Sequence, residues 1–138
     1  MTSTTTLQHL FRIALGVMLC FAGTGHLTWA REAFVAQVPQ WIPFSRDFIV
    51  VASGVVELLL GVSLIFWKRE RVRIGWVTAL FFILVFPGNI AQYVNHTDAF
   101  GLDTDTRRLV RLFFQPVLVI WAVWTTGAWQ AWRRKNNN

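Results

Sequence analysis

The sequence predicts an all-α integral membrane protein, a bundle of four transmembrane helices that forms a single domain over residues 1–138. Apolar residues make up 54% of the chain and charged residues only 14%, whereas soluble domains have about 25% charged residues. A small soluble protein has too much surface for so few charges to cover. Four stretches also reach the length of about 20 mostly apolar residues that a membrane-spanning helix needs. The composition therefore excludes a soluble enzyme domain, a disordered chain and a disulfide scaffold.

The first two predicted helices cover residues 10–29 and 48–67. The first has an entirely apolar centre and becomes more polar toward its end, where His26 lies. No cleavage site of small residues follows it at the right distance, so we expect a retained helix and not a signal peptide. In the second helix Glu57 is the only charged side chain between two long apolar runs.

The third and fourth predicted helices cover residues 74–94 and 109–129. Pro87 interrupts the third helix, and Pro116 lies near the start of the fourth. Each proline lacks a backbone donor and frees a carbonyl one turn earlier. We expect both helices to span the membrane in spite of these prolines, because neighbouring helices can satisfy the freed groups.

The positively charged residues predict the topology. The link at residues 68–73 carries four cations, and the C-terminal end carries Arg133, Arg134 and Lys135. With four helices, these two regions and the N-terminus lie on one side, which the positive-inside rule places in the cytoplasm. We therefore expect a multi-pass protein of the bacterial cytoplasmic (inner) membrane with an N-in/C-in topology.

The connection between the first two helices contains a motif of two prolines around a tryptophan, Pro39, Trp41 and Pro43. The prolines bar a regular helix, and an amphipathic tryptophan ring suits the headgroup region of a bilayer. We expect an interfacial hairpin that covers the outer end of the bundle. An ordinary solvated loop is the alternative.

Charge and cysteine content limit the chemistry. The net charge of +6 comes from cations at the ends of apolar runs, so it indicates membrane topology and not nucleic-acid binding. Cys20 is the only cysteine, so the chain cannot form an internal disulfide, a redox thiol pair or a cysteine-ligated metal site. We expect no metal and no covalently bound cofactor.

Glu57 is the strongest functional signal. It lies about nine residues into its helix, roughly 13 Å deep at 1.5 Å per residue. A charged side chain at the centre of a spanning helix costs roughly 2.5–3.5 kcal/mol. Glu57 shares a helical stripe with Ser53 and Gly61, and small residues let another helix approach closely. Glu57 is therefore expected to face the bundle interior.

The predicted topology places the polar side chains of all four helices in the outer half of the membrane. This coincidence predicts a polar pocket beneath the proline–tryptophan hairpin. Its cap would be Pro39, Trp41 and Pro43, and its ligand-binding residues would be His26, Glu57, Asn89, Gln92, Arg111 and Gln115.

The partner of Glu57 is expected to be either His26 or Arg111. Arg111 would keep Glu57 ionised, whereas His26 could share a proton with it. The alternative is that these polar groups only satisfy one another and hold the helices together.

An ordered set of motifs resembles the DoxX-like family of small four-helix bacterial membrane proteins. The resemblance spans about residues 8–128 and rests on Gly23-x-x-His26, Val38-Pro39-x-Trp41-Ile42-Pro43, Ser53-Gly54-Val55-Val56-Glu57-Leu58, Phe86-Pro87-x-Asn89 and Arg111-x-x-x-Gln115. It implies a four-helix bundle in the cytoplasmic membrane. Some relatives are linked to quinone-dependent thiosulfate oxidation and others to a membrane complex that handles oxidative stress, while most have no established activity.

The sequence thus favours an accessory subunit of a membrane redox system that binds a quinone or a similar lipophilic molecule. Expected partners are the lipid bilayer and a membrane or peripheral oxidoreductase, without nucleic acid, and a homo-oligomer is compatible with the sequence. We do not expect a self-sufficient enzyme. The alternative is a non-catalytic membrane scaffold or assembly protein. A small transporter is disfavoured because the chain lacks an inverted repeat of broken helices.

Overall fold

The computed structural model describes residues 4–29, 31–32, 35, 38, 41–87, 90, 94 and 104–137. This part of the chain is all-α, with five α-helices and one short 3-10 helix. The elements in order are α1 (Thr6–Leu27), α3 (Arg46–Phe66), η1 (Lys68–Glu70), α4 (Arg71–Leu84), α6 (Asp105–Thr125) and α7 (Ala128–Asn136).

Polar caps explain where the three longest helices begin. Thr5 and Gln8 form a capping box at the start of α1. The side chain of Ser45 accepts a hydrogen bond from Phe48 N in α3, and that of Thr104 accepts one from Arg107 N in α6. These oxygens satisfy backbone donors that the first helical turn leaves free.

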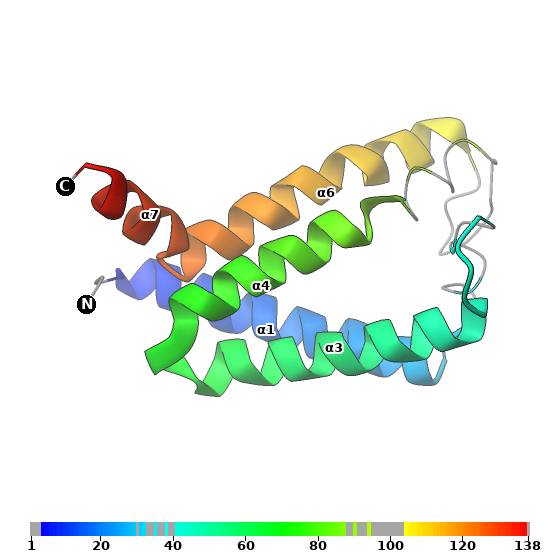
Figure 1. Cartoon of the computed structure of the whole chain (residues 1–138), viewed down its shortest axis with the longest axis horizontal. Helices are drawn as coiled ribbons and strands as arrows, with labels where there is room; N and C mark the ends of the chain where they lie inside the picture. Colours follow the sequence, from blue (N-terminus) through cyan, green and yellow to red (C-terminus); the bar gives the residue numbers. More distant parts are fainter. Residues whose placement is uncertain are drawn as a thin grey trace.

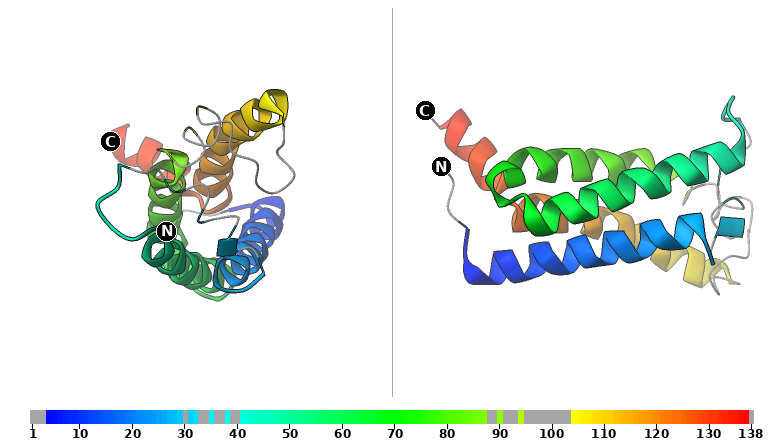
Figure 2. Two further views of the ribbon diagram at one scale, coloured as in Figure 1. Left: turned by 90° about the vertical axis from the view of Figure 1, so that its right-hand side faces the viewer. Right: turned by 90° about the horizontal axis from the view of Figure 1, so that it is seen from below.

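The four long elements run back and forth along the molecule. Figure 1 shows α1 and α3 as one antiparallel pair and α4 and α6 as a second pair lying against the first, with the N- and C-termini at the same end. Both views in Figure 2 agree with this arrangement. η1 joins α3 to α4 at the end that holds the termini, and α7 leans away from the bundle there.

The core draws on all four of these helices, and the outer faces are strongly apolar. The buried cluster consists of Leu15, Leu19, Leu60, Leu64, Ile74, Ala79, Phe81, Phe82, Leu118 and Ala122. Large exposed apolar side chains include Phe21 at 67%, Leu59 at 64% and Phe113 at 68%. So much exposed apolar surface is typical of a protein that contacts lipid.

Two helices, α1 and α3, are long and apolar enough to cross a membrane. A third crossing is added if the bent pair formed by Leu109–Thr125 and Ala128–Asn136 counts as one span. The chain is therefore a multi-pass membrane protein with two or three candidate spans among the described residues. α1 and α3 agree with the predicted helices at 10–29 and 48–67, apart from the N-terminal end of α1, which begins at Thr6.

The second pair differs from the predicted helices at its ends. α4 ends at Leu84 after 14 residues, where the prediction had a helix over 74–94. Val85 is a turn, and the described residues Phe86, Pro87, Ile90 and Val94 are helical again, so the predicted helix is broken after Leu84. Pro87 cannot donate to Ile83 O, which removes one backbone hydrogen bond at this break.

The helix predicted at 109–129 is divided in two. The cap at Thr104 lets α6 begin at Asp105. Gly127 has a φ of 77° between α6 and α7, a left-handed conformation that ends a helix.

Glycines bring α1 and α3 into backbone contact. A Cβ on Gly61 would lie 2.6 Å from Gly16 O, and a Cβ on Gly23 would lie 2.8 Å from Gly54 O. The four glycines recur seven residues apart on each helix, so the two backbones touch at two levels. Such close contacts through small residues are typical of helix pairs in membranes.

Candidate functional site

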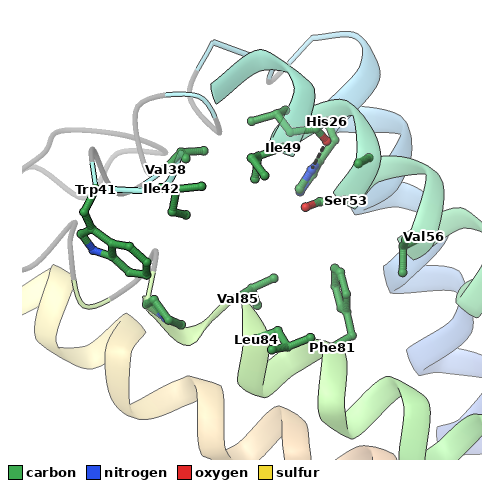
Figure 3. A pocket seen from close by; sticks show the side chains of 13 residues that line it. His26, Val38, Trp41, Ile42, Ile49, Ser53, Val56, Phe81, Leu84 and Val85 are labelled. Atoms are coloured by element: carbon green, nitrogen blue, oxygen red, sulfur yellow. Dashed lines mark hydrogen bonds between the residues drawn. The ribbon is translucent and has the colours of Figure 1, made fainter. Parts of the chain in front are cut away.

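A cavity of about 340 Å³ lies near the end of the bundle opposite the termini. Volumes of roughly 300–1,000 Å³ are usual for small-molecule sites. The wall is mainly apolar and is formed by His26, Val38, Trp41, Ile42, Ile49, Val50, Ala52, Ser53, Val56, Phe81, Leu84, Val85 and Pro87. Figure 3 shows these side chains around the cavity.

Helical spacing explains how α3 and α4 form two of the walls. Ile49, Ser53 and Val56 lie four and three residues apart, so they share one face of α3. Phe81 and Leu84 share a face of α4 in the same way and lie on the other side of the cavity (Figure 3). The cavity therefore lies between the two helix pairs.

The connecting segment contributes a third wall. Trp41 and Ile42 border the cavity together with Val38, although the Trp41 side chain is also 75% exposed at the molecular surface. An ion pair from Arg31 Nε to Asp47 Oδ1 at 2.7 Å ties this segment to the start of α3. Arg31 Nη2 also donates to Asp47 Oδ2. The hydrogen bonds to the Asp47 carboxylate raise the pKa of Arg31, so the pair stays charged.

His26 is the only ionisable residue on the cavity wall, among the described residues, and both of its ring nitrogens face protein atoms. Nδ1 lies 3.2 Å from Val50 O. A carbonyl can only accept, so Nδ1 carries the hydrogen of this bond. Nε2 lies 3.5 Å from Glu57 Oε2, and both side chains are buried, with 6% of His26 and 8% of Glu57 exposed.

The 3.5 Å contact between Nε2 and Oε2 favours a state in which His26 and Glu57 hold one proton between them. If Glu57 carries it, a neutral imidazole accepts at Nε2; if His26 carries it, an imidazolium faces a carboxylate. Without that proton, the Nε2 lone pair would face a buried carboxylate oxygen, which is unfavourable in a low-dielectric interior. The pair is therefore a one-proton unit located directly behind the cavity wall.

Arg111 and Gln115 belong to the other helix pair. Arg111 Nη1 donates to Gln115 Oε1 at 3.1 Å, and Gln115 Nε2 donates to Phe82 O at 2.6 Å. The charge of Arg111 acts on Glu57, but the salt-bridge contact of Glu57 is with His26. Of the two expected partners of Glu57, the structure brings His26 into contact.

Gln115 faces a second cavity of about 320 Å³ between α4 and α6. This cavity is lined by Phe82, Ile83, Phe86, Gln115, Pro116, Val119 and Ile120. Gln115 is only 1% exposed, and its amide nitrogen donates to Phe82 O near the end of α4. It thus holds α6 against the C-terminal end of α4, which ends at Leu84.

The structure therefore divides the expected ligand-binding set. His26 and Trp41 line the first cavity, and Glu57 lies behind His26. Gln115 lines the second cavity, and Arg111 donates a hydrogen bond to it. The exposed Pro43 is not on the cavity wall. The expected residues Asn89, Gln92 and Pro39 lie outside the described residues.

Ser53 is the polar wall residue that the sequence analysis did not assign to the ligand. Its hydroxyl points toward the cavity beside His26 (Figure 3). In the sequence it stood out only as a small residue one turn before Glu57. That spacing was the available signal, because a residue four positions from a buried acid shares its helix face.

Within the part of the chain that the structure describes, no group of three or more His, Cys, Asp or Glu side chains could hold a metal ion. Cys20 is a free thiol in the contact between α1 and α3, close to Gly61. The chemistry available at the cavity is thus hydrogen bonding by Ser53 and proton exchange by His26 and Glu57.

A comparison with known families decides the family membership of the chain. The model of a family described as a domain of unknown function, DUF8561, matches residues 15–126. The chain belongs to the DUF8561 family. The DUF8561 region includes every described residue of the cavity wall and ends at Thr126, just before α7 begins. No curated protein and no solved structure matches the chain.

Proposed function

We propose that this chain is an accessory subunit of a redox system in the bacterial cytoplasmic membrane, and that it binds a quinone or a similar lipophilic molecule in the first cavity. The observation that carries the proposal is the combination of an apolar chamber of about 340 Å³ with the Ser53 hydroxyl and His26 on its wall, and with Glu57 in contact with His26 behind that wall. Its DoxX-like motifs support the redox assignment, since some members of that family are linked to quinones.

The proposed topology is a four-helix bundle with both termini in the cytoplasm and an interfacial hairpin on the outer side. Four passes of α1, α3, α4 and α6 bring both termini to one end. Lys68–Glu70 and the cationic last turn of α7 lie at that same end. The positive-inside rule assigns this end to the cytoplasm, which puts the cavity and Trp41 in the outer half.

The wall residues suit a quinone head group. The Ser53 hydroxyl would donate a hydrogen bond to a carbonyl oxygen of the ring, and the apolar side chains would exclude water. Electrons would come from the partner oxidoreductase, and the head group takes up protons when it is reduced. His26 and Glu57 would hold one of the two protons that a two-electron reduction consumes, and the second would come from the aqueous phase.

Binding of a short-tailed ubiquinone analogue to purified protein in detergent tests the proposal. Ser53→Ala should weaken binding by about fivefold, because one hydrogen bond worth about 1 kcal/mol is lost. Ser63→Ala is the matched control, since Ser63 is on the same helix and outside the cavity wall. Equal affinity of both variants and the unaltered chain would contradict a ligand in this cavity.

One observation favours the second candidate, a non-catalytic scaffold. Both ring nitrogens of His26 already face protein atoms, and so do the described polar atoms of Gln115. If the chain is only a scaffold, Glu57→Gln should lower its stability. The activity of any partner oxidoreductase should then stay unchanged in membranes that contain equal amounts of protein. If the redox proposal holds, Glu57→Gln should instead slow proton-coupled quinone reduction while the head group still binds.

A further inference from the structure

The C-terminal helix α7 is not needed to cross the membrane. The apolar part of α6, Leu109–Thr125, has 17 residues and a length of about 26 Å at 1.5 Å per residue, which is the lower end of the range that crosses the hydrocarbon core. The DUF8561 match also ends at residue 126. The presence of α7 therefore needs an explanation other than membrane crossing.

A built-in bend separates α7 from α6. The two helices meet at 70°, and Gly127 between them has a φ of 77°. The bend packs tightly against α4. A Cβ on Gly75 of α4 would lie only 2.0 Å from Thr126 Oγ1, so Thr126 contacts the glycine directly. If α6 lies close to the membrane normal, α7 lies close to the membrane plane (Figure 1, Figure 2).

The side chains of α7 combine aromatic rings with positive charge. Trp129 and Trp132 stack with ring centroids 5.1 Å apart and stay 48% and 47% exposed. The last turn contributes the cations Arg133, Arg134 and Lys135. Tryptophan favours the boundary between headgroups and acyl chains, and clustered cations attract anionic lipids.

We propose that α7 lies in the membrane interface, with the Trp129–Trp132 pair at the headgroup–acyl boundary and its three terminal cations bound to phosphates of anionic phospholipids. The cations exclude burial in the hydrocarbon core, and the exposed ring pair disfavours full exposure to water. The proposal depends on membrane insertion of the chain and not on the ligand of the cavity.

Depth-dependent fluorescence quenching tests the proposal on the full-length protein in vesicles. Cys20→Ala removes the only thiol, and Trp132→Cys then carries an environment-sensitive label. Gln130→Cys is the matched control, because it is exposed on a different face of α7. Vesicles contain phosphatidylcholine alone or with one quarter phosphatidylglycerol, and spin labels near the headgroup or at the acyl end serve as quenchers.

The label at 132 should be quenched at least about twofold more by the headgroup-proximal spin label than by the deep one, and the label at 130 should be quenched less by both. Phosphatidylglycerol should increase the quenching at 132. Replacing Arg133, Arg134 and Lys135 together by Gln should abolish this increase. Stronger quenching by the deep label would show that α7 continues the span, and absence of quenching would show that it lies in water; either outcome overturns the proposal.

Discussion

At the scale of single residues, the contact between His26 and Glu57 has the greatest chemical consequence. Two titratable groups from α1 and α3 meet in a buried site, and Val50 O determines which imidazole nitrogen carries a hydrogen. Glu57 therefore lies next to Nε2, the ring nitrogen whose protonation can change. The pair can alternate between a neutral and an ionic form by moving a single proton over a short distance.

Substitutions of Glu57 should distinguish a hydrogen-bonding role from a packing role. In Glu57→Gln the amide can still donate to Nε2, so the free energy of unfolding should fall by no more than about 1 kcal/mol. Glu57→Leu replaces the polar group that faces Nε2 by an apolar one and should cost about 1–3 kcal/mol. Denaturant unfolding in detergent measures both, and equal losses would contradict a hydrogen bond to His26.

The sequence predicted part of this site for physical reasons. Burial of Glu57 followed from its cost in lipid and from the small residues on its stripe. The choice between His26 and Arg111 could not be predicted, because it depends on the helix rotations that close packing of α1 on α3 imposes. Ser53 was missed because a hydroxyl is common in membrane helices and only the shape of the cavity distinguishes it.

At the scale of elements, α1 and α3 behave as one unit because their backbones touch through glycines. Each of the four contacts at Gly16, Gly23, Gly54 and Gly61 would place a new Cβ against a backbone atom of the other helix. Backbone atoms cannot move aside independently, so the whole interface would have to separate. This explains why four small residues determine where His26 and Glu57 meet.

Gly61→Ala should therefore destabilise the protein by about 1–3 kcal/mol, as overpacking of a tight interface does. Gly25→Ala is the control on α1, because its Cβ would meet only the Trp29 side chain, at 3.3 Å. That variant should be neutral or slightly stabilising, since alanine favours a helix over glycine by about 1 kcal/mol. Thermal unfolding in detergent compares the two, and similar behaviour would contradict the proposed interface.

The bend after α6 gives a second prediction at this scale. Gly127→Ala forces a residue with a Cβ into a left-handed conformation, which costs about 1–2 kcal/mol. Gly127→Asn should cost less, because asparagine adopts this conformation more readily. Unfolding of the three proteins should follow the order Gly, Asn, Ala, and a more stable alanine variant would show that α6 and α7 prefer to be continuous.

The end of α4 and the start of α6 show that helical periodicity alone does not determine where a helix begins or ends. The apolar pattern continues past Leu84 and therefore predicted one helix to residue 94. The structure instead has a turn at Val85 before the chain is helical again at Phe86 and Pro87, where the proline cannot donate to Ile83 O. The earlier start of α6 comes from the Thr104 cap, a single oxygen that outweighs the polar character of the following residues.

At the scale of the whole molecule, composition was enough to predict an all-α membrane protein. The structure confirms the all-α fold and has two or three helices, among the described residues, that are long and apolar enough to span a membrane. Exposure of this apolar surface to water would cost free energy, whereas in a bilayer the same surface contacts lipid acyl chains. The cavity could not be predicted in the same way. It exists because α4 and α6 contact each other closely while α3 and α4 pack less extensively, a property of the assembled helices and not of any one segment.

The proposed topology makes a direct prediction for reporter fusions. Green fluorescent protein should fluoresce when fused to either terminus, and alkaline phosphatase should be inactive at both, because both ends are expected in the cytoplasm. A phosphatase fused after Trp41 should be active. Opposite results at the two termini would indicate an odd number of crossings and would contradict the N-in/C-in topology.

The looser packing of α3 against α4 also determines how the chamber is reached. Its wall includes Val56 and Leu84, which are 39% and 66% exposed on the outside of the bundle. With the proposed placement in the membrane, this part of the wall would face acyl chains. A water-insoluble molecule dissolved in one leaflet has a sideways diffusion path into the chamber, so its supply depends on its concentration in the bilayer and not on its solubility in the aqueous phase.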